Sequence, residues 1–495
     1  MTEPLTSDND TVLWSKFARS VRSNALGEVA SQAVRVGGFV ALARMLAPSD
    51  IGLLRILLVV SILAGLVCEG GIPDALVQRA DLQSGHEATG WWLNALISVL
   101  VAIALYSSAP MIEHWMNMPR LAVSIRIICP AIVLEGLAWT ANARLRRRLE
   151  FGPLAASEVA AEIGFVATAL VVLLVFKKPR LSLTIGLAAR LSIHALWICC
   201  AERYLPRELP RIKAAREIGR FALSVTASNA LQSLSSNVDY ILVGRFLGPA
   251  QLGFYSMAWD LLRFITNRLS KVAGRVTLPA FCQLQDSNEK LARAYSIFVG
   301  YMGRIVLPAM ACIAVAAPEI LTGIYGAQWL PAAWPLRLLA PGLAIVGLTV
   351  GMGSVFFAKS RPSLDVYLHG IRLVLIVVTV VITARIGGLL GVALGMSIVE
   401  GATSLGGQWL VSRLIDLKTS RLLKAISPGL GAAVSCAIVT ALGKYLAEFL
   451  GLKGAIGLPL IAIPPAAIFL WLEVGTLRNL LGFGSAEIAM ASAGP

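Results

Sequence analysis

The stretch that decides the fold is residues 229–255, NALQSLSSNVDYILVGRFLGPAQLGFY. Polar residues recur in it at helical spacing, so they form a hydrogen-bonding stripe along one side of an otherwise apolar helix. Hydrocarbon does not solvate such a stripe, so we expect it to face the inside of a helix bundle. The stripe consists of Asn229, Gln232, Ser233, Ser236 and Tyr240.

An earlier segment repeats this pattern. Glu28, Ser31, Gln32 and Arg35 occupy the positions of the first four stripe residues. Further along, RMLAPSDIG at 44–52 aligns without a gap on RFLGPAQLG at 245–253, and an apolar helix follows in both copies. We interpret this as an internal duplication that gives two lobes of the same orientation, whose polar stripes are expected to face each other across a solvated cavity.

The composition indicates a membrane protein. Of the 495 residues, 57% are hydrophobic and only 14% are charged, and the mean hydropathy is +0.75, unlike an ordinary soluble domain. We predict an all-α polytopic membrane protein with about 14 helices, each near the roughly 20 residues that cross hydrocarbon. The predicted helices are residues 26–46, 51–73, 88–109, 121–141, 154–176, 181–201, 218–240, 250–272, 293–317, 333–357, 364–384, 388–410, 426–446 and 455–473.

Positive charges orient the chain. Most of the 43 Lys and Arg residues fall in segments that are cytoplasmic if the N-terminus is cytoplasmic, which also places the C-terminus there. This charge lies next to an anionic leaflet, so the pI of 9.8 does not require a nucleic-acid partner. The predicted divisions are an interfacial segment at 1–25, an N-lobe at 26–215, a C-lobe at 216–417, two further helices within 418–480, and a tail at 481–495.

No residue pattern indicates a catalytic, metal or cofactor site. The four histidines are scattered, and most of the seven cysteines lie in or beside apolar spans, where they are interpreted as small buried hydrophobes. No Gly-rich loop ending in Lys-Ser or Lys-Thr is present to bind ATP phosphates. We therefore expect neither enzyme activity nor a cofactor.

Arginines inside the predicted spans carry the functional hypothesis. An arginine in hydrocarbon is costly unless it faces water, a counter-ion or a lipid headgroup, and its guanidinium fork matches phosphate oxygens. Arg190 belongs to this group, but we do not assign it to the site. The predicted substrate-binding residues are Arg35, Arg55, Arg263 and Arg372, together with Gln32, Asn229, Gln232, Ser233 and Ser236.

Acidic residues in or near the spans leave two alternatives open. They can neutralise arginines internally, or they can couple transport to an ion. Glu158 and Glu162 lie one helical turn apart, where like-charge repulsion would suit a shared proton. The alternative for them is a structural pair with Arg126 or Arg190. The candidate ion-coupling residues are Asp239, Asp260, Glu158 and Glu162.

Two segments resemble bacterial Wzx-type oligosaccharide flippases, in the branch that serves exopolysaccharides. They are NVDYILVGRFLGPAQLGFYS at 237–256 and the copy at 44–52. The resemblance covers about residues 20–420 and implies the fold of multidrug extruders and lipid II flippases, with two six-helix lobes around a central cavity and two further helices. It also implies transport of undecaprenyl-pyrophosphate-linked oligosaccharide across the bacterial cytoplasmic membrane, for exopolysaccharide or lipopolysaccharide synthesis. The partners implied are membrane lipids, a polysaccharide polymerase and a chain-length regulator.

The resemblance carries over unevenly to single residues. Lipid II flippases use arginines on the first, second and eighth helices, for which Arg35 and Arg263 are the implied counterparts. Alignment on Glu69-Gly70 puts Ala64 at the second-helix position, so Arg55 departs from the pattern, which argues against lipid II as substrate. A multidrug extruder is the alternative and would bind cations through acids. A scaffold protein would not need matching polar stripes. We predict ion-coupled alternating access through a cationic central cavity.

Overall fold

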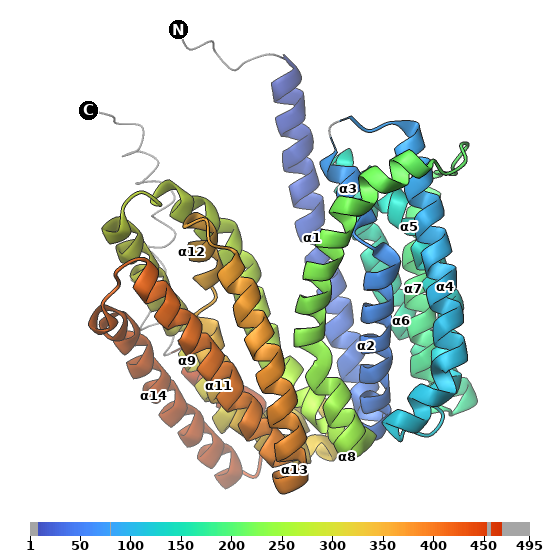
Figure 1. Cartoon of the computed structure of the whole chain (residues 1–495). Coiled ribbons are helices and arrows are strands. Elements are labelled where there is room, and N and C mark those ends of the chain that lie inside the picture. Colours follow the sequence, from blue (N-terminus) through green and yellow to red (C-terminus); the bar gives the residue numbers. More distant parts are fainter. Residues whose placement is uncertain (1–7, 80, 453–456, 468–495) are drawn as a thin grey trace. The chain divides into compact units, whose positions relative to one another are not determined.

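The computed structural model describes residues 8–79, 81–452 and 457–467. Within these ranges every regular element is a helix (Figure 1). Nine helical segments in the described ranges are long and apolar enough to cross a membrane, with Ala327–Ala358 counted as one segment. The prediction of an all-α polytopic membrane protein is therefore confirmed, whereas the count of 14 helices and the lobe boundaries stay predictions.

The chain forms two compact units, residues 1–253 and 254–495, and α8 passes from one to the other. Unit 1 contains α1 (Asp8–Met45), α2 (Pro48–Glu69), α3 (Ile72–Gln78), α4 (Ser84–Met116), α5 (Leu121–Arg147), α6 (Phe151–Phe176), α7 (Pro179–Glu202) and the first part of α8 (Ile212–Gln283). Unit 2 contains the rest of α8, then α9 (Asn288–Val315), α10 (Ala317–Ile320), a π-helical turn (Leu321–Tyr325), a 3-10 helix (Ala327–Ala332), α11 (Ala333–Leu348), α12 (Met352–Ala358), α13 (Ser363–Leu414), α14 (Thr419–Phe449) and a short helix (Leu458–Ala467).

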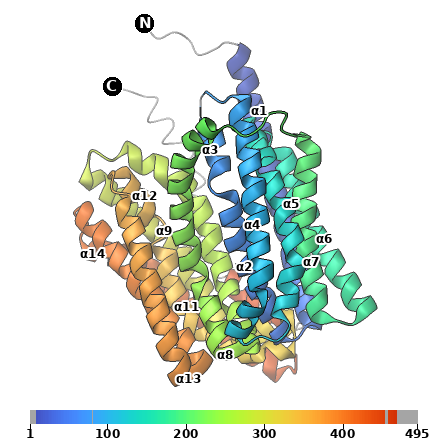
Figure 2. The same cartoon turned by 45° about the vertical axis from the view of Figure 1, so that its right-hand side comes forward.

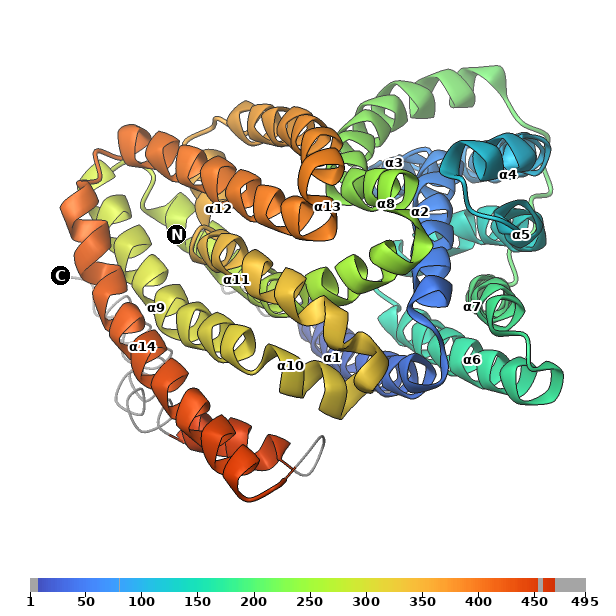
Figure 3. The same cartoon turned by 90° about the horizontal axis from the view of Figure 1, so that it is seen from below.

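In unit 1, helix α6 lies between α1 and α7, and α5 lies between α7 and α4 (Figure 2 and Figure 3). The buried face of α5 carries Leu121, Ile125 and Ile128, and a Cβ at Gly164 of α6 would overlap the side chain of Ile193 on α7. The small residue lets α6 and α7 approach closely. Because α6 has a neighbour on either side, one side chain of α6 can reach both α1 and α7.

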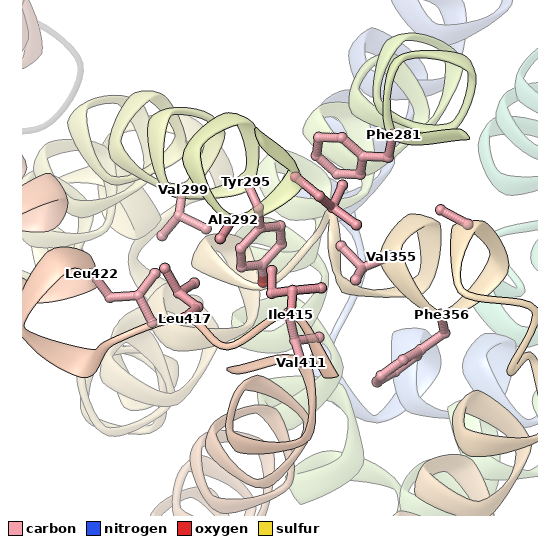
Figure 4. Close-up of a cluster of buried hydrophobic side chains, with 12 residues drawn as sticks. Phe281, Ala292, Tyr295, Val299, Val355, Phe356, Val411, Ile415, Leu417 and Leu422 are labelled. Carbon is pink, nitrogen blue, oxygen red and sulfur yellow. The ribbon is translucent and has the colours of Figure 1, made fainter. Parts of the chain in front are cut away.

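In unit 2, α9 packs against α14 on one side and against α11 on the other, and α11 packs against α13 (Figure 3). A hydrophobic cluster joins α8, α9, α12, α13 and α14 at one end of these helices and includes Phe281, Tyr295, Phe356 and Val411 (Figure 4). The Tyr295 hydroxyl donates to Oε1 of Gln408 at 2.6 Å. Its polar atom is therefore satisfied inside an apolar cluster, as burial requires.

Two long helices are broken at glycines. In α8, Gly248 has φ 84° and ψ 175°, and in α13, Gly388 has φ 54° and ψ −139°, which a residue without a Cβ adopts at little cost. The break at Gly248 falls between two predicted helices, 218–240 and 250–272. The break at Gly388 falls at the first residue of the predicted helix 388–410, just after the predicted helix 364–384. Elsewhere the structure differs from the prediction: α1 is continuous from Asp8, and the span predicted at 333–357 is divided into α11 and α12.

The two copies of the duplicated turn contact each other within unit 1. A Cβ at Gly52 would overlap the carbonyl oxygen of Pro249, and a Cβ at Gly253 would overlap the carbonyl oxygen of Pro48. The start of α2 therefore meets residues 249–253 of α8, which follow the break at Gly248 and still belong to unit 1, at backbone contact distance. The glycine of each copy lies against the proline of the other. The duplication thus produces a reciprocal contact that requires both copies.

Candidate functional site

Two arginines and one glutamate meet inside unit 1, and we call them the Glu162 cluster. Arg35 of α1 donates to Oε1 of Glu162 from Nε at 3.0 Å and from Nη2 at 2.7 Å. Arg190 of α7 donates from Nε to the same oxygen at 2.9 Å. The Glu162 side chain is 4% exposed, whereas those of Arg35 and Arg190 are 46% and 33% exposed. A buried carboxylate on α6 therefore holds two guanidinium groups that are still partly accessible.

The hydrogen-bonded cluster has more positive than negative charge. Arginine stays protonated in proteins, so two cations share one carboxylate. A buried carboxylate without such partners would be strongly disfavoured, which means that Glu162 fastens α1 and α7 to α6. Glu135 on α5 is electrostatically coupled to Arg190, but none of the described hydrogen bonds joins the two. Both arginine side chains are partly exposed, so N–H groups that do not bond to Glu162 can donate to an anion at this point.

Glu158 and Glu162 were predicted as a possible proton-sharing pair, and the structure gives them different surroundings. Glu158 lies on the exposed side of α6, one turn before the buried Glu162. Glu162 bonds to Arg190, the partner that the alternative interpretation named, and also to Arg35, which it did not name. The structure therefore brings together one predicted substrate-binding residue and one predicted ion-coupling residue.

Unit 2 contains an ion pair, Arg372 and Glu400, with the same sequence spacing as Glu162 and Arg190 in unit 1. In the unit 2 pair the arginine comes first. Arg372 and Glu400 lie on either side of the break in α13. Arg372 donates from Nε to both carboxylate oxygens at 3.1 Å and from Nη2 to Oε1 at 2.5 Å. Its side chain is 15% exposed and that of Glu400 5%. Both this pair and the Glu162–Arg190 pair are separated by 28 residues. Unlike the Glu162 cluster, the unit 2 pair is balanced in charge and largely enclosed.

The other two arginines predicted to bind substrate lie over aromatic rings. In unit 1 the Arg55 guanidinium is 4.6 Å from the ring centroid of Tyr240, and in unit 2 that of Arg263 is 5.8 Å from the ring centroid of Trp259. Such cation–π contacts replace part of the hydration that a guanidinium loses on burial. A predicted ion-coupling acid stands next to each ring in the sequence: Asp239 is buried and Asp260 is half-buried.

The polar stripe of α8 is mostly half-buried. Gln232 is exposed, whereas Asn229, Ser233 and Ser236 are half-buried, as is Gln32 on α1. The carbonyl oxygen of Ser233 accepts a hydrogen bond of 2.8 Å from the Asn237 side chain. The expectation that the stripes of α1 and α8 face each other across a solvated cavity stays a prediction.

A second buried glutamate shared by two arginines was missed in the sequence. Glu202, at the end of α7, accepts from Arg144 Nε at 2.5 Å and lies 3.0 Å from Arg148 Nη2. Arg144 also pairs with Glu87 of α4. Two arginines and two glutamates therefore balance here. This network ties together the ends of α4, α5 and α7 and is a natural comparison for the unbalanced Glu162 cluster.

Next to this network, the beginning of α8 is tied to the beginning of α4. Glu217 of α8 accepts from Arg79 Nη2 at 2.6 Å and lies 3.1 Å from Nε2 of His86. The hydrogen bond with His86 and the bond to Arg79 hold the pKa of the Glu217 carboxyl below its usual range. These ion pairs therefore fasten the beginning of α8 to the end of α3 and the beginning of α4.

Comparison with known proteins identifies the family. Residues 41–334 match the family described as "Polysaccharide biosynthesis protein", which is more than half of the chain. The chain belongs to this family. Within this polysaccharide biosynthesis protein, the matched range contains Glu162, Arg190 and Arg263, whereas Arg35 lies before it and Arg372 after it.

Three relatives of this polysaccharide biosynthesis protein are about a quarter identical to it over the residues that align. The teichuronic acid biosynthesis protein TuaB of Bacillus subtilis (strain 168) is 25% identical over 74% of this chain and 76% of its own length. The lipopolysaccharide biosynthesis protein WzxC of Escherichia coli (strain K12) is 26% identical over 72% of this chain and 73% of its own. The succinoglycan biosynthesis transport protein ExoT of Rhizobium meliloti (strain 1021) is 26% identical over 90% of this chain and 91% of its own length. The predicted resemblance to Wzx-type proteins is confirmed.

Solved structures establish the fold. The lipid II flippase MurJ in its inward closed conformation has a TM-score of 0.75 at 15% identity, over 92% of this chain and 99% of its own. A multidrug resistance MATE family transporter in an inward-facing conformation has a TM-score of 0.64 at 15% identity, over 78% of this chain and 96% of its own. The similarity in fold to lipid II flippases and multidrug extruders is thus confirmed, whereas the two six-helix lobes around a central cavity stay a prediction.

Proposed function

We propose that this protein is a flippase that moves undecaprenyl-pyrophosphate-linked oligosaccharide across the bacterial cytoplasmic membrane, for exopolysaccharide or lipopolysaccharide synthesis. The observation that carries the proposal is the Glu162 cluster, in which two partly exposed arginines share one buried carboxylate. A pyrophosphate that enters a membrane protein loses hydration, and guanidinium groups replace it with charge-assisted hydrogen bonds. The relatives named for teichuronic acid, lipopolysaccharide and succinoglycan biosynthesis support a glycan as cargo.

Transport proceeds in this proposal by alternating access, in which the headgroup is exposed in turn to the two sides of the membrane. Arg35 binds the pyrophosphate, and polar stripe residues such as Gln32 and Asn229 bind the glycan. Arg263, which the sequence resemblance implies as a counterpart of a lipid II flippase arginine, is a further candidate ligand. Asp239 and Asp260 are candidates for coupling to an ion, since acids within spans are costly unless they serve such a purpose. A polysaccharide polymerase and a chain-length regulator act on the exported repeat unit. Both chain termini are cytoplasmic.

The test is export in a strain whose own copy of the gene has been deleted. Arg35→Ala should abolish surface polysaccharide and leave lipid-linked oligosaccharide on the cytoplasmic face, because the headgroup loses a bidentate ligand. Arg35→Lys keeps the charge without the fork and should restore export in part. Surface polysaccharide and the amount of the protein in the membrane are measured together for each variant.

Arg126→Ala is the matched control. It removes a cation whose guanidinium lies 4.9 Å from the ring centroid of Tyr106, outside the candidate site, and export should stay near the level of the unchanged protein. Normal export by Arg35→Ala at normal protein level would exclude the cationic-site mechanism. An extruder of cationic drugs, as in the MATE family transporters of similar fold, would then be the better explanation.

A further inference from the structure

The Glu162 cluster leaves most of its hydrogen-bonding capacity unused. Each guanidinium has five N–H donors. Within the described part of the chain, Arg35 uses two of them and Arg190 one, all on the same oxygen of Glu162. Both arginine side chains are partly exposed, while the carboxylate is buried. An incoming anion can therefore reach the arginines from the exposed side without first reaching Glu162.

Two other sets of ion pairs, Arg372–Glu400 and the network around Glu202, lack this combination of excess positive charge and accessible guanidinium groups. Arg372 places three hydrogen bonds on Glu400 and is itself mostly enclosed, so little of its side chain is open to an anion. The two arginines at Glu202 are balanced by Glu87 as a second acid. Among these three sets of ion pairs, the Glu162 cluster alone combines an excess cation with partly exposed guanidinium groups.

We propose that Glu162 is an internal competitor of the substrate phosphate for Arg35 and Arg190, and that Arg190 is a further phosphate ligand. This inference rests on the proposed function and adds to it the regulation of the same site. When a phosphate binds, the arginine N–H groups transfer from Glu162 to phosphate oxygens. When the phosphate leaves, the Glu162 carboxylate again accepts hydrogen bonds from both arginines. Glu162 thereby weakens binding enough for release, since a transported ligand must be bound tightly enough to enter and weakly enough to leave.

Glu162→Gln separates this role from a structural one. The amide keeps the size of the side chain but removes its charge, so both arginines become available and the affinity for pyrophosphate should rise by about tenfold, the effect of roughly one charge-assisted hydrogen bond. Export should fall, because release becomes slow. A purely structural glutamate would give weaker binding or less folded protein. Binding is measured by calorimetry on the full chain in lipid nanodiscs, with inorganic pyrophosphate as probe.

Two further variants keep the test decisive. Arg190→Ala should lower the affinity for pyrophosphate by about tenfold, with partial recovery in Arg190→Lys, even if Glu162→Gln does not fold. Glu202→Gln is the matched control, because it removes an equivalent buried charge from a balanced network and should leave the affinity unchanged. Folded Glu162→Gln with unchanged or weaker binding, or Arg190→Ala with unchanged binding, would overturn the proposal.

The ligand source and the proposed function are tested separately. Nanodiscs that contain undecaprenyl pyrophosphate should compete with inorganic pyrophosphate at the unchanged protein, whereas nanodiscs without it should not. Absence of competition would show a site for free phosphates and would overturn the assignment of lipid-linked phosphate as ligand. If the unchanged chain fails to restore export in the deletion strain, the proposed function is wrong, and the calorimetric results still decide whether Glu162 competes with phosphate.

Discussion

Glu400→Leu should strongly reduce the amount of folded protein, and exchange of the two charges should restore it. The single variant leaves the Arg372 guanidinium, 15% exposed, without its carboxylate. Breaking a buried ion pair on one side costs about 3–5 kcal/mol, a large part of the roughly 5–15 kcal/mol that stabilises a typical protein. The measurement is the yield of monodisperse protein in detergent and the temperature at which half of it is lost.

The exchange is the decisive arm of this experiment. Arg372→Glu combined with Glu400→Arg gives α13 the order of charges that Glu162 and Arg190 have in unit 1, at the same spacing of 28 residues. The attraction is retained, so the double variant should recover most of the lost yield. Asp81→Leu is the control, because its side chain is 76% exposed in the pair with Arg79 and such pairs contribute about 0–1 kcal/mol. Normal stability of Glu400→Leu would contradict the argument.

Gly52→Ala and Gly253→Ala should each disrupt the contact between the two duplicated turns. In both, the new Cβ would overlap a proline carbonyl oxygen of the other copy, and backbone cannot move aside as a flexible side chain can. Inserting a carbon into a well-packed contact costs about 1–3 kcal/mol, and we expect the upper part of that range here. The yield of monodisperse protein and its thermal half-loss temperature should fall for both variants.

A glycine of the same helix provides the control. Gly65 on α2 has open space where a Cβ would be placed, so Gly65→Ala should be neutral or slightly stabilising, because alanine has the higher helix propensity. Equal behaviour of Gly52→Ala and Gly65→Ala would show that the reciprocal contact does not limit stability. The two turn variants should also resemble each other, since each glycine meets the other copy's proline in the same way.

Much of the fold was predictable because the signals are local. Hydropathy over about 20 residues identifies a membrane helix, and the predicted range 51–73 corresponds to α2 (Pro48–Glu69). Local patterns were less reliable where a helix is interrupted without a change in hydropathy. The span predicted at 333–357 is apolar throughout, yet it is divided between α11 and α12.

The candidate site was predictable only in part. Arg35 and Glu162 were both singled out because each is a charged residue in an apolar span, but nothing local connects residues 127 positions apart. Arg190 was recognised as costly without being assigned to the site, and Glu400 was not paired with Arg372. The equal spacing of 28 residues in the two pairs was present in the sequence. It is informative only once one knows that the helices carrying these residues lie side by side.

The sequence by itself determined the class of protein, the likeness of residues 44–52 to residues 245–253 and the family, because composition, periodicity and short motifs are properties of neighbouring residues. The tertiary structure decided which charges neutralise one another. It placed α6 between α1 and α7, so that Glu162 reaches two arginines, and it brought the two halves of α13 together, so that Arg372 is paired with Glu400. The physical reason is that electrostatic interactions depend on distance in space and on burial, and neither can be read from position in the chain.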